Sequence, residues 1–307
     1  MRGARVAFQR VFDAIFLARP VLLGPVWVVY GAGAVIAGAR PGIDLLFVSL
    51  VVAGVYIHNQ IADVDADRAN DKLFLLADGL VSRRTAWTLA VTYWIAALAW
   101  AALHGQRFWL YLTAFLLGFA YNAGVPSPWK GRPWLGLLAN AAAHATITFM
   151  AGYVAAGGDF AEGFVRSMPY TTAVAAVYLG TTIMDHVGDA AVGKQTFAVR
   201  YGARTTSRVI GALIVASAVF AGALGDWWMA TASVCAIVSL PWLLRNPSRV
   251  SAERVVKTAV LALSVVVAIR WPILGVLAAA TFFASRIYYC RRFSIRYPSF
   301  GPTQTTL

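Results

Sequence analysis

The sequence has little charge, and very little of that charge is acidic. Asp and Glu together number 13 in 307 residues, against 26 Lys and Arg, and charged residues make up 13% of the chain while hydrophobic residues make up 60%. This composition excludes an ordinary soluble domain and is typical of a membrane protein with many spans. A net charge of +13 also occurs in nucleic-acid-binding proteins, but most basic residues here fall in short loops between apolar segments, so we expect no nucleic-acid partner.

Cysteine is almost absent, and the common marks of a soluble enzyme are missing too. Cys235 lies inside an apolar run and Cys290 beside a basic run, so neither a disulfide nor a CxxC metal site is expected. No Ser-His-Asp or Cys-His set and no Gly-rich phosphate loop stands out. Residues 1–19 are basic and amphipathic without an uninterrupted apolar core, which predicts an interfacial helix rather than a cleaved signal peptide.

Apolar segments make up most of the chain after residue 19. Ten can be marked, at residues 20–38, 43–61, 86–104, 108–123, 134–156, 169–185, 207–224, 227–244, 255–269 and 272–289. The last two are short and separated only by Arg270–Pro272, so one broken span is an alternative to a hairpin. With ten spans, one side collects every basic residue except Arg40, Arg107, Arg166 and Arg270. The positive-inside rule then predicts that both termini are cytoplasmic.

The order of these segments repeats. Residues 20–123 and 134–244 each hold four segments in the same orientation, and each set has an acidic motif after its second segment. We therefore predict an all-α integral membrane protein, a single domain over 1–307, with nine to ten transmembrane helices in two four-helix repeats around a central cavity. Residues 255–289 are additional helices, and 297–307 a loose tail.

The two acidic motifs are the candidate functional site. Asn59, Asp63 and Asp67 recur every four residues, so on a helix they share one face, and Asp185 and Asp189 repeat the carboxylate pair at the same offset along the chain. Clustered side-chain oxygens repel one another unless a cation lies between them, and Mg²⁺ binds through carboxylates, water and substrate phosphates. The spacing predicts a Mg²⁺ site held by these five residues.

These motifs resemble those of the UbiA superfamily of intramembrane polyprenyl transferases. Asn59-Gln60-x-x-Asp63-x-x-x-Asp67 is similar to the family's first motif, and Asp185-x-x-x-Asp189-x-x-x-Gly193-Lys194-x-Thr196 to its second. Further similar positions are Arg19-Pro20, Tyr121-Asn122, Pro126–Arg132 and Asn140. The sequence differs from the family pattern at two places, and both bear on which substrate is bound. Phe74-Leu75 stands where relatives carry Arg-Pro, and Thr182 stands where many relatives carry an acidic residue.

The resemblance implies a Mg²⁺-dependent transfer of a polyprenyl group from its diphosphate to an aromatic or other lipid-precursor acceptor, with release of pyrophosphate. The site would lie at the cytoplasmic face of the plasma membrane of a prokaryote. The aspartates Asp63, Asp67, Asp185 and Asp189 are the expected catalytic residues. Lys194 is the first candidate for a pyrophosphate contact, followed by the basic residues Arg68, Lys72 and Lys130.

The remaining pocket candidates have plain structural alternatives. Tyr121, Asn122, Asn140 and Tyr178 fit a pocket, and packing or a helix–helix hydrogen bond accounts for each equally well. For His144, in the fifth segment, an interhelical hydrogen bond is the expected role.

Two other functions remain open. A UbiA-like terpene cyclase would share the opening ionisation and differ in how the carbocation is captured. A carboxylate-lined ion or proton transporter also combines internal repeats with membrane acids. The acids here lie at helix ends beside basic loops, which favours phosphate handling over ion passage.

Overall fold

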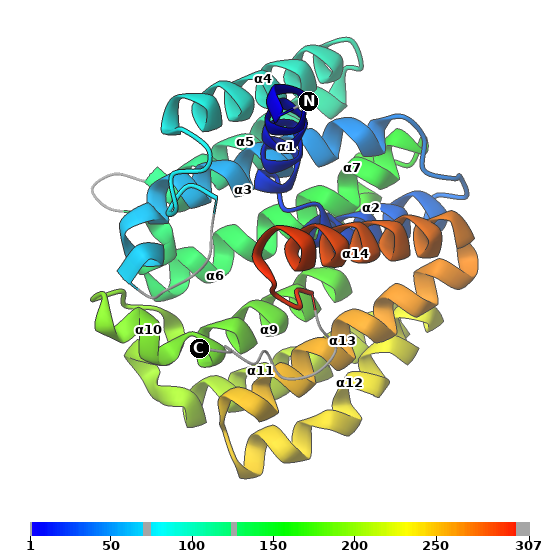
Figure 1. Cartoon of the computed structure of the whole chain (residues 1–307). Coiled ribbons are helices and arrows are strands. Elements are labelled where there is room, and N and C mark those ends of the chain that lie inside the picture. The colour runs from blue at the N-terminus through cyan, green and yellow to red at the C-terminus, as the bar shows by residue number, and fades with distance from the viewer. Residues whose placement is uncertain (1, 70–74, 124–127, 299–307) are drawn as a thin grey trace.

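Every regular element in the described part of the chain is a helix (Figure 1). A computed structural model describes residues 2–69, 75–123 and 128–298, with side chains described for 9–64, 75–123 and 128–298. The elements, in chain order, are α1 (Arg2–Leu17), η1 (Pro20–Leu22), α2 (Leu23–Ile36), α3 (Asp44–Ala69), α4 (Arg83–Ala102), α5 (Gln106–Ala123), η2 (Trp129–Gly131), α6 (Pro133–Ala141), η3 (Ala142–Ile147), α7 (Thr148–Ala155), α8 (Phe160–Arg166), α9 (Met168–Met184), α10 (His186–Ala191), α11 (Phe197–Ala223), α12 (Trp227–Arg245), α13 (Arg249–Arg270) and α14 (Pro272–Phe293). Here η1 and η2 are 3-10 turns, and η3 is a π-helical turn.

Helices cover all ten predicted apolar segments. Seven helical stretches of the described chain are long and apolar enough to cross a membrane, judged by length and composition. Residues 255–289 form two helices rather than one broken span, because Trp271 leaves helical geometry and Pro272 begins α14. The two helices, α13 and α14, then pack against each other (Figure 1).

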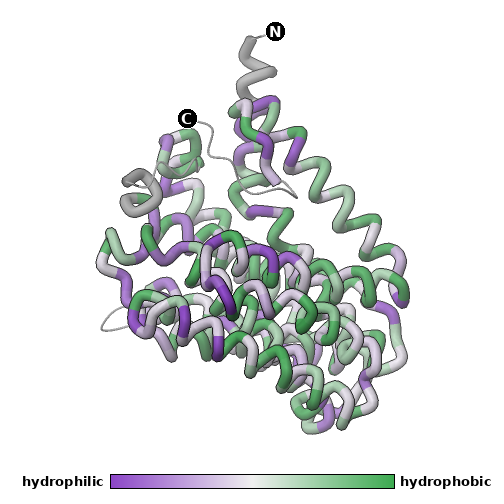
Figure 2. The backbone as a smooth tube through the Cα atoms, turned by 90° about the horizontal axis from the view of Figure 1, so that it is seen from below, coloured by the Kyte–Doolittle hydropathy of each residue, from purple (hydrophilic) through white to green (hydrophobic). Residues whose placement is uncertain are grey.

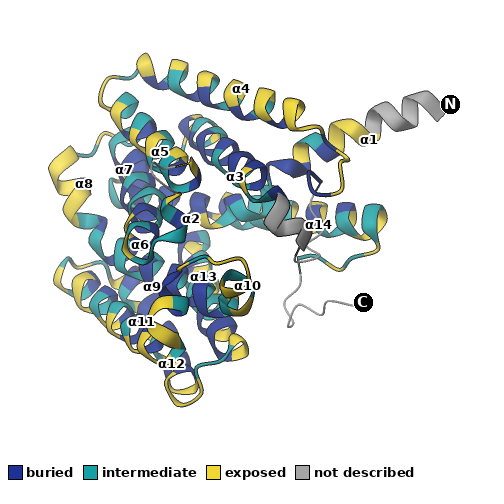
Figure 3. Cartoon of the chain, turned by 90° about the vertical axis from the view of Figure 1, so that its left-hand side faces the viewer, coloured by how far each residue is buried: buried dark blue, intermediate teal, exposed yellow. Residues whose placement is uncertain are grey.

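The helices present apolar side chains outward as well as inward. Figure 2 shows hydrophobic residues along most of the helical tube, and large apolar side chains such as Ile95, Val219 and Val238 are exposed. Buried residues concentrate on the interior helices α2, α3 and α9, while α4 and α12 carry many exposed ones (Figure 3). Helices that are apolar on their outer faces suit a lipid surround.

Helices α2 and α7, which lie in the first apolar segment of each predicted repeat, cross at two glycines. A Cβ placed at Gly33 in α2 would overlap the carbonyl oxygen of Phe149, and one at Gly152 in α7 would overlap the carbonyl oxygen of Tyr30. Small residues at a crossing allow close backbone approach inside a membrane. The contact is reciprocal, so the two helices approach each other closely at both glycines.

The two ends of the described chain are held together by one buried carboxylate. Asp13 in α1 is 3% exposed. It accepts a hydrogen bond from the Tyr288 hydroxyl (2.6 Å) and pairs with Arg292 (3.3 Å). The rings of Phe16 and Tyr288 stack with centroids 3.9 Å apart. As a result α1 is fixed against the last helix, and part of its apolar surface remains outward.

A second buried carboxylate, that of Asp44, joins four helices near their ends. Asp44, at the start of α3, accepts two hydrogen bonds of 3.0 Å from the Arg107 guanidinium and one of 3.2 Å from the Trp100 indole. The same Arg107 donates to the carbonyl oxygen of Ala155, and the Tyr111 hydroxyl donates to the carbonyl oxygen of Asp44. These bonds fix the spacing of α3, α4, α5 and α7.

Candidate functional site

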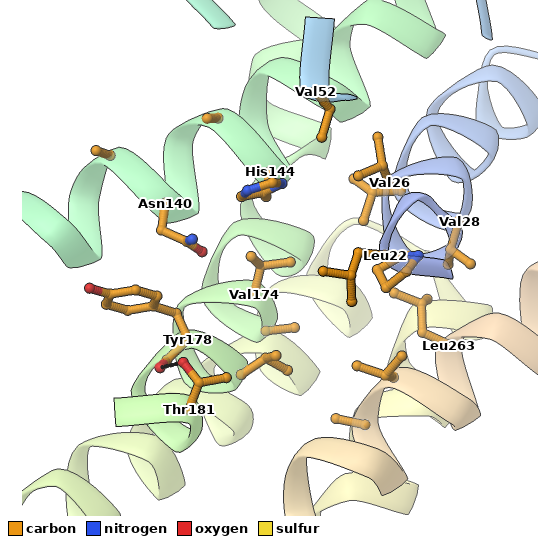
Figure 4. Close-up of a pocket in the computed structure, with 18 of the residues that line it drawn as sticks. Leu22, Val26, Val28, Val52, Asn140, His144, Val174, Tyr178, Thr181 and Leu263 are labelled. Atoms are coloured by element: carbon orange, nitrogen blue, oxygen red, sulfur yellow. Dashed lines mark hydrogen bonds between the residues drawn. The ribbon is translucent and has the colours of Figure 1, made fainter. Parts of the chain in front are cut away.

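A cavity of about 560 Å³ lies between the helices. Its walls are mostly Val, Leu, Ile and Ala side chains from α2, α3, α5, α9, α12 and α13, and its polar groups come mainly from α3, α5, α6, η3 and α9 (Figure 4). Among the described lining residues the aromatic rings are Tyr56, Tyr121, Tyr178 and the imidazole of His144. The cavity therefore combines an aliphatic interior with a small number of polar and aromatic groups, as ligand pockets do.

Asp63 lies in a cluster of polar side chains at the C-terminal part of α3. Its Oδ1 is 2.8 Å from the Lys130 ammonium and 3.4 Å from the Lys194 ammonium. One turn earlier, Asn59 donates a 2.8 Å hydrogen bond to Oδ1 of Asn122, which also accepts a 3.5 Å bond from Lys130. The helical spacing of Asn59 and Asp63 places both side chains in this cluster.

The second acidic motif spans a break between two helices. α9 ends at Met184, Asp185 has non-helical angles (φ −98°, ψ 4°), and α10 begins at His186. The backbone N–H of Asp189 still donates to the carbonyl oxygen of Asp185 at 2.8 Å. The four-residue spacing of the carboxylates is therefore kept across the break, and Asp185 lines the cavity.

Gly193 returns the chain to the site after α10. Its φ of 72° is in the left-handed region that glycine adopts without strain. Its N–H donates to the carbonyl of Ala190, and the N–H of Lys194 donates to that of Asp189, which is the Schellman pattern that ends a helix. This turn brings the Lys194 ammonium to 3.4 Å from Asp63 and 4.0 Å from Asp189.

One ammonium thus lies between the two acidic motifs, which are far apart in sequence. Six predicted site residues form this contact network: Asn59, Asp63, Asn122, Lys130, Asp189 and Lys194. Tyr121, Asn140, Tyr178 and Asp185 line the cavity beside it. The side chains of Asp67 and Arg68, and all of Lys72, lie outside the described residues.

The donor chemistry here is suited to a hard cation. Asp63 and Asp189 both approach the same ammonium, so two carboxylates of different helices already share one cationic partner. The described side chains contain no group of three or more His, Cys, Asp or Glu in reach of one ion, and Asp67 is not among them. Oxygen ligands from both motifs would fit an ion that is also bound by phosphate oxygens.

Comparison with known proteins decides the family. The model of the UbiA prenyltransferase family matches residues 17–265. The chain belongs to the UbiA prenyltransferase family. With its apolar helices, this UbiA chain is an integral membrane protein. No curated protein matches it.

Solved structures of UbiA homologues share the fold. A homologue from Archaeoglobus fulgidus bound to GPP and Mg²⁺ is 20% identical, with a TM-score of 0.65 over 86% of this chain and 99% of the other. A homologue from Aeropyrum pernix K1 is 18% identical, with a TM-score of 0.62 over 86% and 98%. A digeranylgeranylglyceryl phosphate synthase is 17% identical, with a TM-score of 0.59 over 87% and 99%.

The structure of this UbiA chain also adds residues that the sequence did not single out as site residues. Tyr56, Thr181 and Arg19 line the cavity. Tyr56 precedes Asn59 by three residues and lies on the same face of α3. This helical spacing could have identified Tyr56 as a site residue from the sequence. The interhelical hydrogen bond expected for His144 is not present among the described residues, and its ring lines the cavity instead.

Proposed function

We propose that this protein transfers a prenyl group from a prenyl diphosphate to an acceptor, with Mg²⁺ as cofactor. The observation that carries the proposal is the convergence of Asp63 and Asp189 on the Lys194 ammonium beside a long apolar cavity. The UbiA homologue from Archaeoglobus fulgidus, solved with GPP and Mg²⁺, supports the same ligands here. Asn59, Asp63, Asp67, Asp185 and Asp189 would hold the metal.

The residues around the cluster fit the opening step of the reaction. When bound, Mg²⁺ would neutralise charge that grows on the leaving diphosphate. Lys130 and Lys194 add fixed ammonium groups beside the same oxygens, and such preorganised charge is the largest source of rate enhancement in many enzymes. Arg68 and Lys72 are further candidates for this contact. The aliphatic walls hold the prenyl chain and exclude water from the cation.

The character of the walls favours transfer over cyclisation. A terpene cyclase guides a migrating carbocation with aromatic faces, which attract cations. Here the described aromatic lining residues are few (Tyr56, Tyr121 and Tyr178), and Val, Leu and Ala form most of the wall. A cation formed near the acidic cluster has little to stabilise it along the rest of the cavity. Capture by an acceptor near that cluster is therefore favoured.

The cavity is suited to a prenyl chain. Its volume of about 560 Å³ is within the range of pockets that enclose a whole small ligand. We propose farnesyl and geranylgeranyl diphosphate as donors, because their long apolar chains suit the aliphatic walls. The distribution of basic residues supports the further proposal that the cluster and both termini face the cytoplasm at a prokaryotic plasma membrane.

The test is pyrophosphate release by the purified protein from farnesyl and geranylgeranyl diphosphate, with Mg²⁺ and with EDTA. We expect release only with Mg²⁺, and a fall of about 10²–10³-fold in Asp63→Asn and Asp189→Asn, because each removes charge from the metal site. Asp159→Asn, which changes a helix cap on α8, is the matched control. Release that persists in EDTA or in both site variants would refute the proposal.

A further inference from the structure

The connection between α1 and α2, residues 17–22, forms an elbow that lies against the acidic motif of α3. The Gln60 side-chain amide donates a 2.6 Å hydrogen bond to the carbonyl oxygen of Leu17, and the Tyr56 hydroxyl donates a 3.2 Å bond to that of Leu22. Gln60 and Tyr56 are one helical turn apart on α3, and the first residue of the acidic motif lies between them. The elbow is therefore attached at the level of that motif.

Arg19 has the least favourable backbone conformation in this elbow. Its angles, φ 51° and ψ 61°, are in the left-handed region, although it is not glycine and the residue before a proline is normally extended. Such conformations persist where the surrounding structure holds them, and they cluster at functional sites. Arg19 lines the cavity. The elbow therefore brings a guanidinium group, whose planar fork suits phosphate oxygens, to the cavity wall.

The last helix, α14, holds the first helix immediately before the elbow (Figure 1). The buried Asp13 carboxylate accepts a 2.6 Å hydrogen bond from Tyr288 and pairs with Arg292 at 3.3 Å. Phe16, next to the elbow in sequence, stacks on the Tyr288 ring at 3.9 Å. α14 also packs directly against η1 and α2. The elbow is thus held by α3 on one side and by α14 on the other.

The segment after α14 also comes close to Arg19. The Tyr297 ring packs edge-on against Tyr289 with centroids 5.1 Å apart, and Arg286 donates a 3.4 Å hydrogen bond to the carbonyl oxygen of Pro298. Burial raises the pKa of the Tyr297 hydroxyl, and the positive charge of Arg19 partly opposes this rise. The chain that follows α14 is therefore folded back along that helix, within electrostatic reach of the elbow.

The contact between α1 and α14 is not part of the family match. The family model matches residues 17–265, and the side chains that make the contact lie on either side of that range: Asp13, Phe16, Tyr288 and Arg292. The elbow and both acidic motifs lie within the range. Two ends of this chain that the family model does not cover therefore hold a part of the site that it does cover.

We propose that α14 is a positioning element for the donor site, in which Tyr288, through Asp13, holds the elbow and its Arg19 against the acidic motif. The proposal rests on the function proposed above. Without this bond the elbow is held on one side only, and Arg19 is in place in a smaller fraction of the molecules. The apparent affinity for a diphosphate falls by that fraction. Bound diphosphate then keeps Arg19 in place, so kcat changes little.

The experiment measures KM and kcat for pyrophosphate release from farnesyl diphosphate with Mg²⁺, and the melting temperature of each variant. Tyr288→Phe removes one hydroxyl and keeps the ring, and Arg292→Gln is the milder second variant. Each is also made together with Arg19→Gln, and where release is too slow for kinetics the Kd of the donor is titrated instead. The matched control is Tyr170→Phe, because the Tyr170 hydroxyl also donates to a carboxylate, that of Asp226 at 2.7 Å, and joins α9 to the start of α12.

We expect Tyr288→Phe to raise the KM for farnesyl diphosphate about tenfold, the lower end for a charged hydrogen bond, with little change in kcat. Arg292→Gln should raise the KM by a smaller factor, because Tyr288 still holds α1. Tyr170→Phe should lower the melting temperature as Tyr288→Phe does and keep the wild-type KM. In the Arg19→Gln chain, Tyr288→Phe should raise the KM no further, since the residue that it positions is already gone.

The inference is overturned if Tyr288→Phe and Arg292→Gln keep the wild-type KM, if Tyr170→Phe raises the KM equally, or if Tyr288→Phe acts equally with and without Arg19. If Tyr288→Phe does not fold, Arg292→Gln decides by the same comparison. Active wild type with unaffected variants thus refutes this inference alone. No release by wild type would refute the proposed function and, with it, this inference.

Discussion

Replacing Lys130 by Met should change metal binding and donor binding in opposite directions. The Lys130 ammonium is 2.8 Å from Asp63, and the two side chains are only 10% and 15% exposed, so water screens the pair weakly. In the protein alone this ammonium competes with a metal ion for the carboxylate. When a diphosphate is bound, the same ammonium becomes an attractive partner for phosphate oxygens.

The size of both effects follows from the worth of a charged hydrogen bond. Such a bond contributes about 1.5–3 kcal/mol, or roughly 10- to 100-fold in binding. Lys194 remains 3.4 Å from Asp63 and compensates in part, so the lower end applies. We expect Lys130→Met to bind Mn²⁺ or Mg²⁺ about tenfold more tightly without diphosphate, and to raise the KM for farnesyl diphosphate about tenfold at saturating Mg²⁺.

Two measurements on the detergent-purified protein check this. Isothermal titration gives the metal affinity without diphosphate, and pyrophosphate release gives the KM. Lys257→Met is the matched control, because Lys257 also pairs with a carboxylate, Glu253, at 2.6 Å, and its side chain is 41% exposed. Weaker metal binding in Lys130→Met, or an unchanged KM, would show that Lys130 supports the shape of the site rather than its charge balance.

Three further predictions concern the framework. Arg107→Met removes the cationic partner of Asp44 and should destabilise the fold by about 3–5 kcal/mol, seen as a lower melting temperature that Asp44→Asn in the same chain partly restores. Gly152→Leu forces the crossing of α2 and α7 apart and should cost about 1–3 kcal/mol or more in stability, while Gly222→Ala, with open space around its Cβ, should cost none. Gly193→Ala strains a residue at φ 72° by about 1–2 kcal/mol; we expect a lower kcat with a nearly unchanged melting temperature, and a normal kcat would contradict the role of that turn.

The meeting of the two acidic motifs was predictable because a carboxylate spacing that recurs in both halves of a chain rarely arises without a shared structural role. Carboxylates that recur at helical spacing beside membrane segments require a cationic partner, and the structure supplies Lys194 to Asp63 and Asp189. The closest partner of Asp63 was harder to find. Lys130 resembled an ordinary loop charge that sets topology, and only the packing of η2 against α5 and α6 brings its ammonium to 2.8 Å from Asp63.

The deeper part of the site could not be predicted for a similar reason. The sequence around His144 is alanine-rich and has the composition of an ordinary helix, so nothing in it marks a π-helical turn. Thr146 in this turn shares a hydrogen bond with Thr171 of α9, a contact between residues of different helices that the local sequence does not reveal. The interhelical hydrogen bond predicted for His144 is not present among the described residues. A local sequence pattern carries no information on which neighbouring side chains a residue contacts.

The bond between the first and last helices has a consequence for how the chain is made. Asp13 and its partner Tyr288 are 275 residues apart in sequence. At about 5–20 residues per second, the ribosome needs on the order of 14–55 seconds between them. During that interval the carboxylate of α1 lacks both of these partners, Tyr288 and Arg292, and is more stable in contact with water than in lipid. We therefore expect α1 to stay at the membrane surface until α14 is inserted, so that closing this contact is a late event in biogenesis.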